Sequence, residues 1–361
     1  MRRTSLAALA LTVVATLACT SGPGSTSAPG TAPAPTPGPT SAGTVTTGAG
    51  RQDAAGRKAV SDDRRVLAIS VDGLNPSALK RLGPDRTPVL HQLLAEGAST
   101  RNARTARELT LTLPNHTGMV TGRRIDDARG GHGVTWNTHR PGTTVQRAAG
   151  RGVASVFSVV HAAGGESVVF TGKEKFTLFD RSWPAGVDEL TYDEDPLALV
   201  KAARRDLLHE DRSLTFLHLA TPDVAGHAHG FMSPRYLDAV ARTDRLLGKL
   251  VKALQGVAEV WRSTAVVLTA DHGGKGRDHF DPTRLADHRV PFLVWGHDIE
   301  AADLYRINPG RTAPGTSRTS YAGTQPVRNA DLANVVTGLL GLDPVPGSGI
   351  GRTDPLVVDR D

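Results

Sequence analysis

The C-terminal half of the sequence contains aspartates and histidines at spacings that suit metal ligands. Asp223 and His227 lie four residues apart in PDVAGH, so one helical turn or a tight loop would bring both toward one ion. Asp271 and His272 are adjacent in ADHGG, and His279 follows in GKGRDHFDP. Carboxylate oxygens mixed with imidazole nitrogens, without thiolates, favour Zn²⁺, Mn²⁺ or a similar ion. Because this set exceeds what one tetrahedral ion requires, the pattern predicts two divalent metal ions.

A second stretch, TLTLPNHTGMVTG at residues 110–122, contains four threonines and one histidine around a proline. Threonine is a poor nucleophile at neutral pH unless a base or a metal ion activates its hydroxyl. Thr112, ahead of Leu113 and Pro114, is also a suitable cap for a helix start. Both roles are compatible, since the free N–H groups of a helix start can face a bound phosphate. The stretch alone leaves the nucleophile and the cap as alternatives.

Short aliphatic runs and longer helical patterns alternate from residue 64 onward. The aliphatic runs predict buried strands at 66–71, 167–170, 214–219, 264–269 and 290–295. The helical patterns lie at 88–98, 155–165, 196–210, 233–256 and 329–342. This alternation predicts one α/β domain with a mostly parallel central sheet and helices on both faces.

Three of the predicted strands are followed closely by an aspartate: Asp72, Asp223 and Asp271. Taken singly, each has an ordinary explanation as a helix cap or a turn residue. In open α/β sheets, however, ligands bind in the crevice beyond the carboxyl ends of the strands. Together with the histidines, the three aspartates therefore predict one site at that edge of the sheet.

The N-terminus has the pattern of an export signal. Arg2 and Arg3 precede an apolar run at 6–18, which predicts a signal peptide over 1–18 and an extracytoplasmic protein. Cys19, the only cysteine, follows in TLAC, which resembles a bacterial lipobox and predicts a lipid anchor; the alternative is secretion with Cys19 removed. Residues 19–62 are rich in Pro, Gly, Ser and Thr and predict a disordered tether, followed by a catalytic domain at 63–361.

The composition excludes some classes of partner. Hydrophobic residues make up 39% of the chain, charged residues 22% and aromatic residues 4%, and the formal net charge is +6. The arginines are scattered without interleaved aromatic residues, which argues against a nucleic-acid platform. A basic surface favours a small anionic substrate. Nothing in the sequence indicates an oligomeric state.

Taken in order, these motifs resemble those of the alkaline phosphatase superfamily, and most closely its nucleotide pyrophosphatase/phosphodiesterase branch. The resemblance spans roughly residues 64–350. It rests on four motifs, DG after the first strand, TLPNH, PDVAGH and ADHGG, and on one later histidine. The residues concerned are Asp72, Thr112, Asp223, His227, Asp271, His272 and His279. It implies an alkaline-phosphatase-like fold and two zinc ions, with Mn²⁺ or another divalent ion as an alternative.

The resemblance also implies individual roles. One zinc would be held by Asp223, His227 and His279, and the other by Asp72, Asp271 and His272 beside Thr112. Thr112 would be both a ligand and the nucleophile that forms a covalent phosphothreonine, because two metals can clamp the attacking and leaving oxygens of an in-line displacement. His288 is the alternative to His279 as the last ligand.

Two further motifs carry candidate substrate contacts. Asn137, in GGHGVTWN, resembles an asparagine that donates to a phosphate oxygen in the family, a role that stabilises the transition state. Lys173 and Lys175, in FTGKEKFTLF, resemble a lysine pair that binds the substrate carboxylate in phosphonoacetate hydrolases. The alternative for both lysines is simple exposure to solvent.

The predicted activity is hydrolysis of phosphodiesters or nucleotide pyrophosphates. A phosphomonoesterase and a phosphonate hydrolase are alternatives with the same metals. A non-catalytic surface protein that binds metal or phosphate is a third, although such a protein has no need of the Thr112 hydroxyl. The segment 176–200 carries no motif that would identify the substrate.

Overall fold

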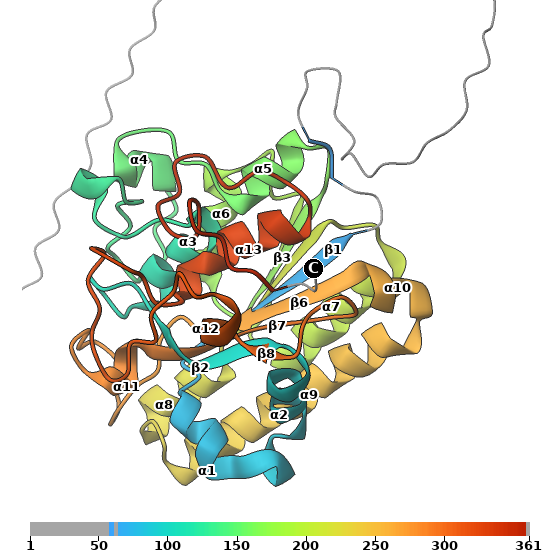
Figure 1. Ribbon diagram of the computed structural model, residues 1–361, viewed down its shortest axis with the longest axis vertical. Coiled ribbons are helices and arrows are strands. Elements are labelled where there is room, and N and C mark those ends of the chain that lie inside the picture. The colour runs from blue at the N-terminus through green and yellow to red at the C-terminus, as the bar shows by residue number, and fades with distance from the viewer. Residues whose placement is uncertain (1–57, 61–63, 359–361) are drawn as a thin grey trace, which may run out of the picture. The chain divides into compact units, whose positions relative to one another are not determined.

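The computed structural model describes residues 58–60 and 64–358. Its centre is an eight-stranded sheet with the order β4-β3-β5-β1-β6-β7-β2-β8 (Figure 1). The strands are β1 (Arg65–Val71), β2 (Ala98–Arg104), β3 (Ser167–Thr171), β4 (Glu189–Tyr192), β5 (Leu214–Leu219), β6 (Thr264–Thr269), β7 (Arg289–Trp295) and β8 (Ala302–Asp303).

Five successive strands, β4, β3, β5, β1 and β6, pair in parallel with one another. The next strand, β7, pairs antiparallel with both β6 and β2. The predicted mostly parallel sheet is confirmed, and so are the five predicted strands. The structure adds β2, β4 and β8, which the sequence did not predict. Of these, β2 reads ASTRNAR and lacks the large aliphatic residues that mark a buried strand.

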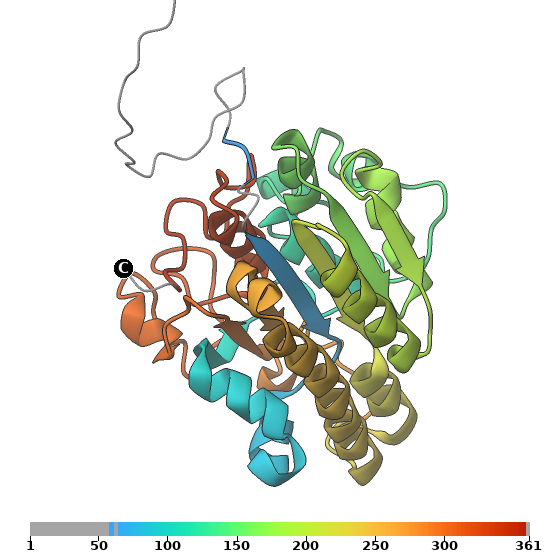
Figure 2. The same ribbon diagram turned by 90° about the vertical axis from the view of Figure 1, so that its right-hand side faces the viewer.

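Helices cover both faces of the sheet, as predicted (Figure 2). α7 and α9 pack together on one face, while α13 packs against β1 and β6 on the other. The helices are α1 (Pro76–Arg86), α2 (Pro88–Glu96), α3 (Thr112–Thr121), α4 (Val145–Ala149), α5 (Val156–Ala162), α6 (Thr177–Ser182), α7 (Pro196–His209), α8 (Thr221–His229), α9 (Pro234–Gly256), α10 (Ala258–Ser263), α11 (Leu285–His288), α12 (Leu304–Ile307) and α13 (Leu332–Leu339).

The central strands β5 and β1 lie in the hydrophobic core. β5 is buried at every residue and β1 at every residue after Arg65, as expected for a parallel sheet covered on both faces. Such strands are rigid supports, so the loops at their carboxyl ends hold side chains in fixed positions.

The predicted signal peptide (1–18), Cys19 and nearly all of the predicted tether (19–62) lie outside the described residues. Among the helices of residues 58–60 and 64–358, none has the length and apolar character needed to cross a membrane.

Candidate metal centre

The loops after three adjacent strands deliver the three predicted aspartates to one place. β5, β1 and β6 are neighbours in the sheet. Asp72 follows β1 directly, Asp271 lies two residues after β6, and Asp223 lies in the first turn of α8 after β5. All three side chains are buried.

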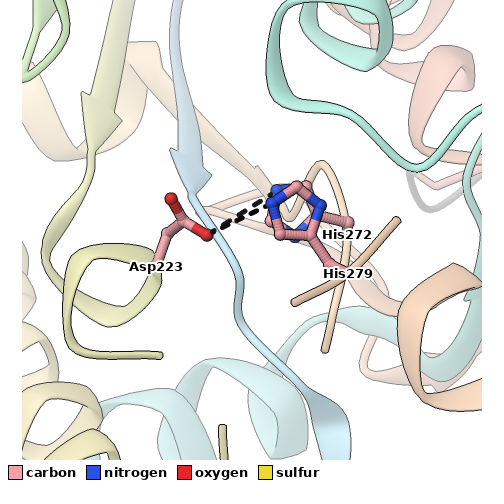
Figure 3. A group of neighbouring side chains, drawn as sticks. All are labelled: Asp223, His272 and His279. Atoms are coloured by element: carbon pink, nitrogen blue, oxygen red, sulfur yellow. Dashed lines mark ion pairs between the residues drawn. The ribbon is translucent and has the colours of Figure 1, made fainter. Parts of the chain in front are cut away.

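Asp223, His272 and His279 form one group, with ligand atoms within 4.8 Å of one another. Oδ1 of Asp223 lies 3.7 Å from Nε2 of His279 and 3.9 Å from Nε2 of His272. Figure 3 shows the two stacked imidazole rings facing this one carboxylate oxygen. His227 joins the group from the next turn of α8, with its Nε2 3.3 Å from the same oxygen.

Asp72, Asp271 and His272 form a second group within the same 4.8 Å limit. Nε2 of His272 lies 3.1 Å from Asp271 Oδ2 and 3.4 Å from Asp72 Oδ1. The Oγ of Thr112 is 3.4 Å from the same nitrogen. His272 therefore lies between the two groups, whereas the sequence placed it in the second group alone.

The carboxylates of both groups have oxygens without a hydrogen-bond partner. Asp72 Oδ1, Asp223 Oδ1 and Asp271 Oδ2 are buried and accept no hydrogen bond. Buried polar atoms are usually paired, because leaving one unpaired costs about 1–3 kcal/mol. These unpaired oxygens are the atoms that face the imidazole nitrogens, so the residues present fit divalent cations.

The tautomers of the three histidines also suit metal ligation. Nδ1 of each ring lies close to a backbone carbonyl oxygen. The distances are 2.9 Å from His227 to Arg277, 2.9 Å from His272 to Gly273 and 2.6 Å from His279 to Thr110. A carbonyl only accepts, so each Nδ1 carries the hydrogen and donates it. With the hydrogen on Nδ1, Nε2 is the nitrogen of each ring that faces the centre and would bind a metal ion, as in metal-binding histidines generally.

Charge in the metal-free centre is concentrated on the carboxylates. Burial opposes ionisation of Asp72, but Lys173, His218 and His272 hold its pKa well below the usual range. Burial likewise opposes protonation of His272, yet Asp271, Asp223 and Asp72 raise its pKa to about 9. Without metal, the His272 ring therefore carries a proton on Nε2 that a bound metal ion would displace.

Thr112 is the first residue of α3, and its hydroxyl does not cap the helix. Leu111 is the N-cap residue and makes no side-chain cap bond, so the capping alternative is wrong. His116, one turn later, donates from Nδ1 to the Thr112 carbonyl at 2.8 Å and accepts from Ser70 Oγ at 2.7 Å. These bonds fix the start of α3 against β1 and leave the Thr112 hydroxyl facing His272.

Asn137 and Lys175 lie next to this helix start. Asn137 Oδ1 accepts from the Leu113 N–H and from Lys175 Nζ, both at 2.9 Å. The amide oxygen is therefore occupied, and the Asn137 Nδ2 hydrogens remain for another acceptor. Lys173 Nζ instead forms ion pairs with Asp72 Oδ2 at 2.6 Å and with Asp223 Oδ2 at 2.7 Å.

His279 and His288 differ clearly in position. His279 is part of the first group, while His288 donates from Nδ1 to the Pro282 carbonyl at 3.1 Å. Burial and the neighbouring Arg104 lower the pKa of His288 to about 4. The geometry favours His279 as the ligand.

Two residues that hold the centre in place by hydrogen bonds were missed by the sequence prediction. His218, within β5, donates from Nε2 to Asp72 Oδ2 at 3.0 Å. Tyr236 of α9 donates to the Gly73 carbonyl at 2.8 Å and accepts from the Asn75 N–H at 3.0 Å, which holds the loop after β1. The sequence signal for His218 was a histidine inside the aliphatic run LTFLHL. Tyr236 had no such signal.

A cavity of about 500 Å³ lies beside the centre. Lys173 and Lys175 line it on the side of the metal centre, and Val224 of α8 and Arg242 of α9 line it elsewhere. Its rim carries Tyr192, whose hydroxyl donates to Glu194 at 2.7 Å. The cavity has room for a substrate group attached to a phosphate at the centre.

Solved structures share this fold. One is an inactive variant of murine ectonucleotide pyrophosphatase/phosphodiesterase 5 in complex with AMP, with a TM-score of 0.62 and 16% identity, covering 82% of this chain and 100% of that chain. Another is a protein of the alkaline phosphatase superfamily from Vibrio parahaemolyticus, with a TM-score of 0.56 and 16% identity. The match covers 83% of this chain and 73% of that chain. The fold class is therefore alkaline-phosphatase-like, as predicted.

Residues 66–324 match the type I phosphodiesterase/nucleotide pyrophosphatase family. The chain belongs to this family, which confirms the resemblance seen in its motifs. The superfamily is metal-dependent, and the two groups above are the candidate ligands in this chain.

Curated relatives include GPI ethanolamine phosphate transferase 1 of Neurospora crassa, 31% identical over 164 residues, and of Gibberella zeae, 30% identical over 151 residues. The matches cover 41% and 40% of this chain but only 15% of either relative. This chain therefore corresponds to a small part of those proteins.

Proposed function

We propose that this protein hydrolyses phosphodiesters or nucleotide pyrophosphates with two zinc ions, through a covalent phosphothreonine at Thr112. The observation that carries the proposal is the set of unpaired, buried oxygens on Asp72, Asp223 and Asp271, which face imidazole nitrogens beside the Thr112 hydroxyl. The proposed ligands are Asp223, His227 and His279 for one ion and Asp72, Asp271, His272 and Thr112 for the other.

When bound, the metal ions would lower the pKa of the Thr112 hydroxyl and withdraw charge from the phosphoryl oxygens. Thr112 Oγ then forms a bond to phosphorus as the bond to the leaving oxygen breaks, and the leaving group takes up a proton. Asn137 Nδ2 donates to a phosphoryl oxygen, because its own carbonyl oxygen is already occupied by Leu113 and Lys175. A water oxygen then forms a bond to phosphorus as the bond from phosphorus to Thr112 Oγ breaks; the monoester is released, and one proton of the water goes to Thr112 Oγ.

The cavity beside the centre supports an ester or anhydride larger than a simple monoester. Its volume of about 500 Å³ accommodates a leaving group, and its lining includes charges of both signs: Lys175 and Arg242, with Glu174 and Glu194. A phosphonate hydrolase remains the second candidate, because Lys175 reaches this cavity and would contact a carboxylate there.

The test is a substrate panel for the full chain: a bis-aryl phosphate, an aryl monophosphate, a dinucleotide, a nucleotide pyrophosphate and phosphonoacetate. Each is assayed before chelation, after chelation and after zinc or manganese is added back. We expect the diester or pyrophosphate substrates to be hydrolysed fastest and zinc to restore the rate. Preferred hydrolysis of phosphonoacetate would support the second candidate, and binding without turnover of any substrate would support the binding protein.

We also infer that the catalytic domain, from residue 63, acts outside the cytoplasm, secreted or held by lipid on Cys19. The support is the sequence of residues 1–62 alone. Fractionation of cells expressing the wild type and Cys19→Ser tests this: release of the variant from membranes supports the anchor, and equal release of both supports secretion.

A further inference from the structure

Lys173 contacts the two metal groups at once. Its Nζ lies 2.6 Å from Asp72 Oδ2 and 2.7 Å from Asp223 Oδ2, and its side chain is only 18% exposed. We propose that Lys173 is a positioning residue that couples the two metal sites, by orienting one carboxylate ligand of each. This inference rests on the proposed function, since it takes Asp72 and Asp223 to be metal ligands.

The two oxygens of each carboxylate have different partners. In both Asp72 and Asp223, Oδ2 accepts from the Lys173 ammonium, while Oδ1 is unpaired. Oδ1 of Asp72 faces His272 at 3.4 Å, and Oδ1 of Asp223 faces His227 at 3.3 Å. The ammonium therefore turns each carboxylate so that a single oxygen is presented to a metal ion.

Lys173 itself is held in place by the strands around it. Its N–H donates to Thr171 Oγ at 3.2 Å, and the Gly172 N–H donates to His218 Nδ1 at 3.3 Å. Nδ1 of His218 is thus an acceptor, so Nε2 carries the hydrogen that is donated to Asp72 Oδ2. The turn after β3 is in this way bound to β5, and Lys173 reaches from it to the ends of β1 and α8.

Gly172 permits this close arrangement. A Cβ at this position would lie 3.1 Å from the Cβ of Ala220, the residue after β5. A side chain at Gly172 would require the turn and β5 to separate by a few tenths of an ångström, so the absence of a Cβ lets the turn that carries Lys173 lie close to β5.

The charge balance of the centre also depends on Lys173. Among the described residues, it is the only lysine or arginine that makes an ion pair with Asp72, Asp223 or Asp271. Without it, two buried carboxylates would repel each other across the gap between the metal sites. A lysine engaged by two carboxylates has little freedom to bind a substrate carboxylate as well.

Zinc titration of the metal-free full chain by calorimetry, with bound zinc counted by mass spectrometry, tests the proposal. Hydrogen-bond partners of metal ligands typically contribute about 10- to 100-fold to metal affinity. We expect Lys173→Met to weaken both zinc sites together by about this factor. Lys201→Met is the control, because Lys201 is an exposed residue of α7 outside the loops that hold the proposed ligands, and it should leave both affinities unchanged.

Unchanged or tighter zinc binding by Lys173→Met, or loss at one site only, would overturn the coupling. A raised KM with wild-type zinc affinity would instead identify a substrate-binding lysine. If the wild type bound no zinc, the proposed function would fail together with this inference. If the wild type bound zinc and Lys173→Met bound it equally well, this inference alone would fail. Should Lys173→Met not fold, Lys173→Arg keeps the charge with a different geometry; it should shift both affinities together, and independent behaviour of the two sites would overturn the proposal.

Discussion

Nε2 of His227 and Nε2 of His279 lie 3.1 Å apart, although both rings have already given their Nδ1 hydrogens to backbone carbonyls. In the neutral tautomers, two nitrogen lone pairs therefore face each other. Such an arrangement is unfavourable unless a cation lies between them or within reach of both. Asp223 Oδ1, 3.3 Å from one nitrogen and 3.7 Å from the other, completes a three-ligand site.

The first prediction follows from this site: removal of metal lowers the thermal stability of the protein. A ligand at a hundred times its Kd stabilises by about 2.7 kcal/mol, which corresponds to a rise in Tm of about 5 °C for a domain of this size. Differential scanning fluorimetry with chelator and with added zinc measures the shift. His227→Ala should reduce it, and the exposed His229→Ala, two residues away, should not. An identical Tm with and without chelator would contradict a metal site here.

The second prediction concerns the Thr112 hydroxyl. Thr112→Ala should lower kcat by about 10³-fold or more, because the nucleophile is lost, while zinc binding through the aspartates and histidines persists. Thr112→Ser should keep part of the activity. Thr117→Ser is the control, since the Thr117 hydroxyl donates within α3 to the Leu113 carbonyl. Full turnover by Thr112→Ala on every active substrate would exclude the covalent mechanism.

The third prediction concerns the amide of Asn137. Removing one donor to a developing negative charge typically lowers kcat about 10²- to 10³-fold, and Asn137→Ala should fall in this range with little change in KM. Asn137→Asp should be at least as slow, because a carboxylate cannot donate and repels phosphate. Steady-state kinetics on the preferred diester measure both variants. A change confined to KM would assign Asn137 to ground-state binding.

The fourth prediction is an alkaline limit to activity set by Lys175. Burial, followed by the charge of Lys173, lowers the pKa of the Lys175 ammonium to about 8. Lys175 is therefore charged at neutral pH and loses its charge as the pH rises through about 8. If the ammonium attracts the anionic substrate, kcat/KM should fall above that pH. Lys175→Arg, which stays charged, should abolish this limb of the pH profile, and an unchanged profile would contradict the role.

The sequence predicted the central strands and the three aspartates well, because both depend on local pattern. Buried parallel strands are aliphatic, and their carboxyl ends share one edge, so Asp72, Asp223 and Asp271 could be brought together without coordinates. The edge strand β4 was missed because its residues are only partly buried, and a polar edge has no distinctive pattern.

The interactions between strands could not be predicted in the same way. His218 reaches Asp72 because β5 pairs with β1 in the register that sets it beside Ser70, and register depends on the whole sheet. The sequence left Lys173 as either a substrate contact or a solvent-exposed side chain, yet its ammonium lies between two carboxylates because β3 pairs Thr171 with His218. The position of His272 between both groups likewise depends on the tertiary packing of its loop.

The last prediction compares two glycines that both have positive φ. Gly73, after Asp72, has φ +71° and Gly83 has φ +67°, so alanine is strained at both positions, by about 1–3 kcal/mol. A Cβ at Gly83 would meet nothing within 4 Å, whereas one at Gly73 would lie 3.1 Å from the Cα and Cβ of Asp223.

Gly83→Ala should therefore lose stability alone, whereas Gly73→Ala should lose stability and also displace a proposed metal ligand. Urea unfolding measures the free energies of unfolding of both variants, and zinc titration measures their affinities. We expect the zinc affinity of Gly83→Ala to match the wild type and that of Gly73→Ala to be weaker. Equal zinc affinities of the two variants would mean that the loop after β1 can move without disturbing Asp223, in which case close packing of Gly73 on α8 is not what positions that ligand.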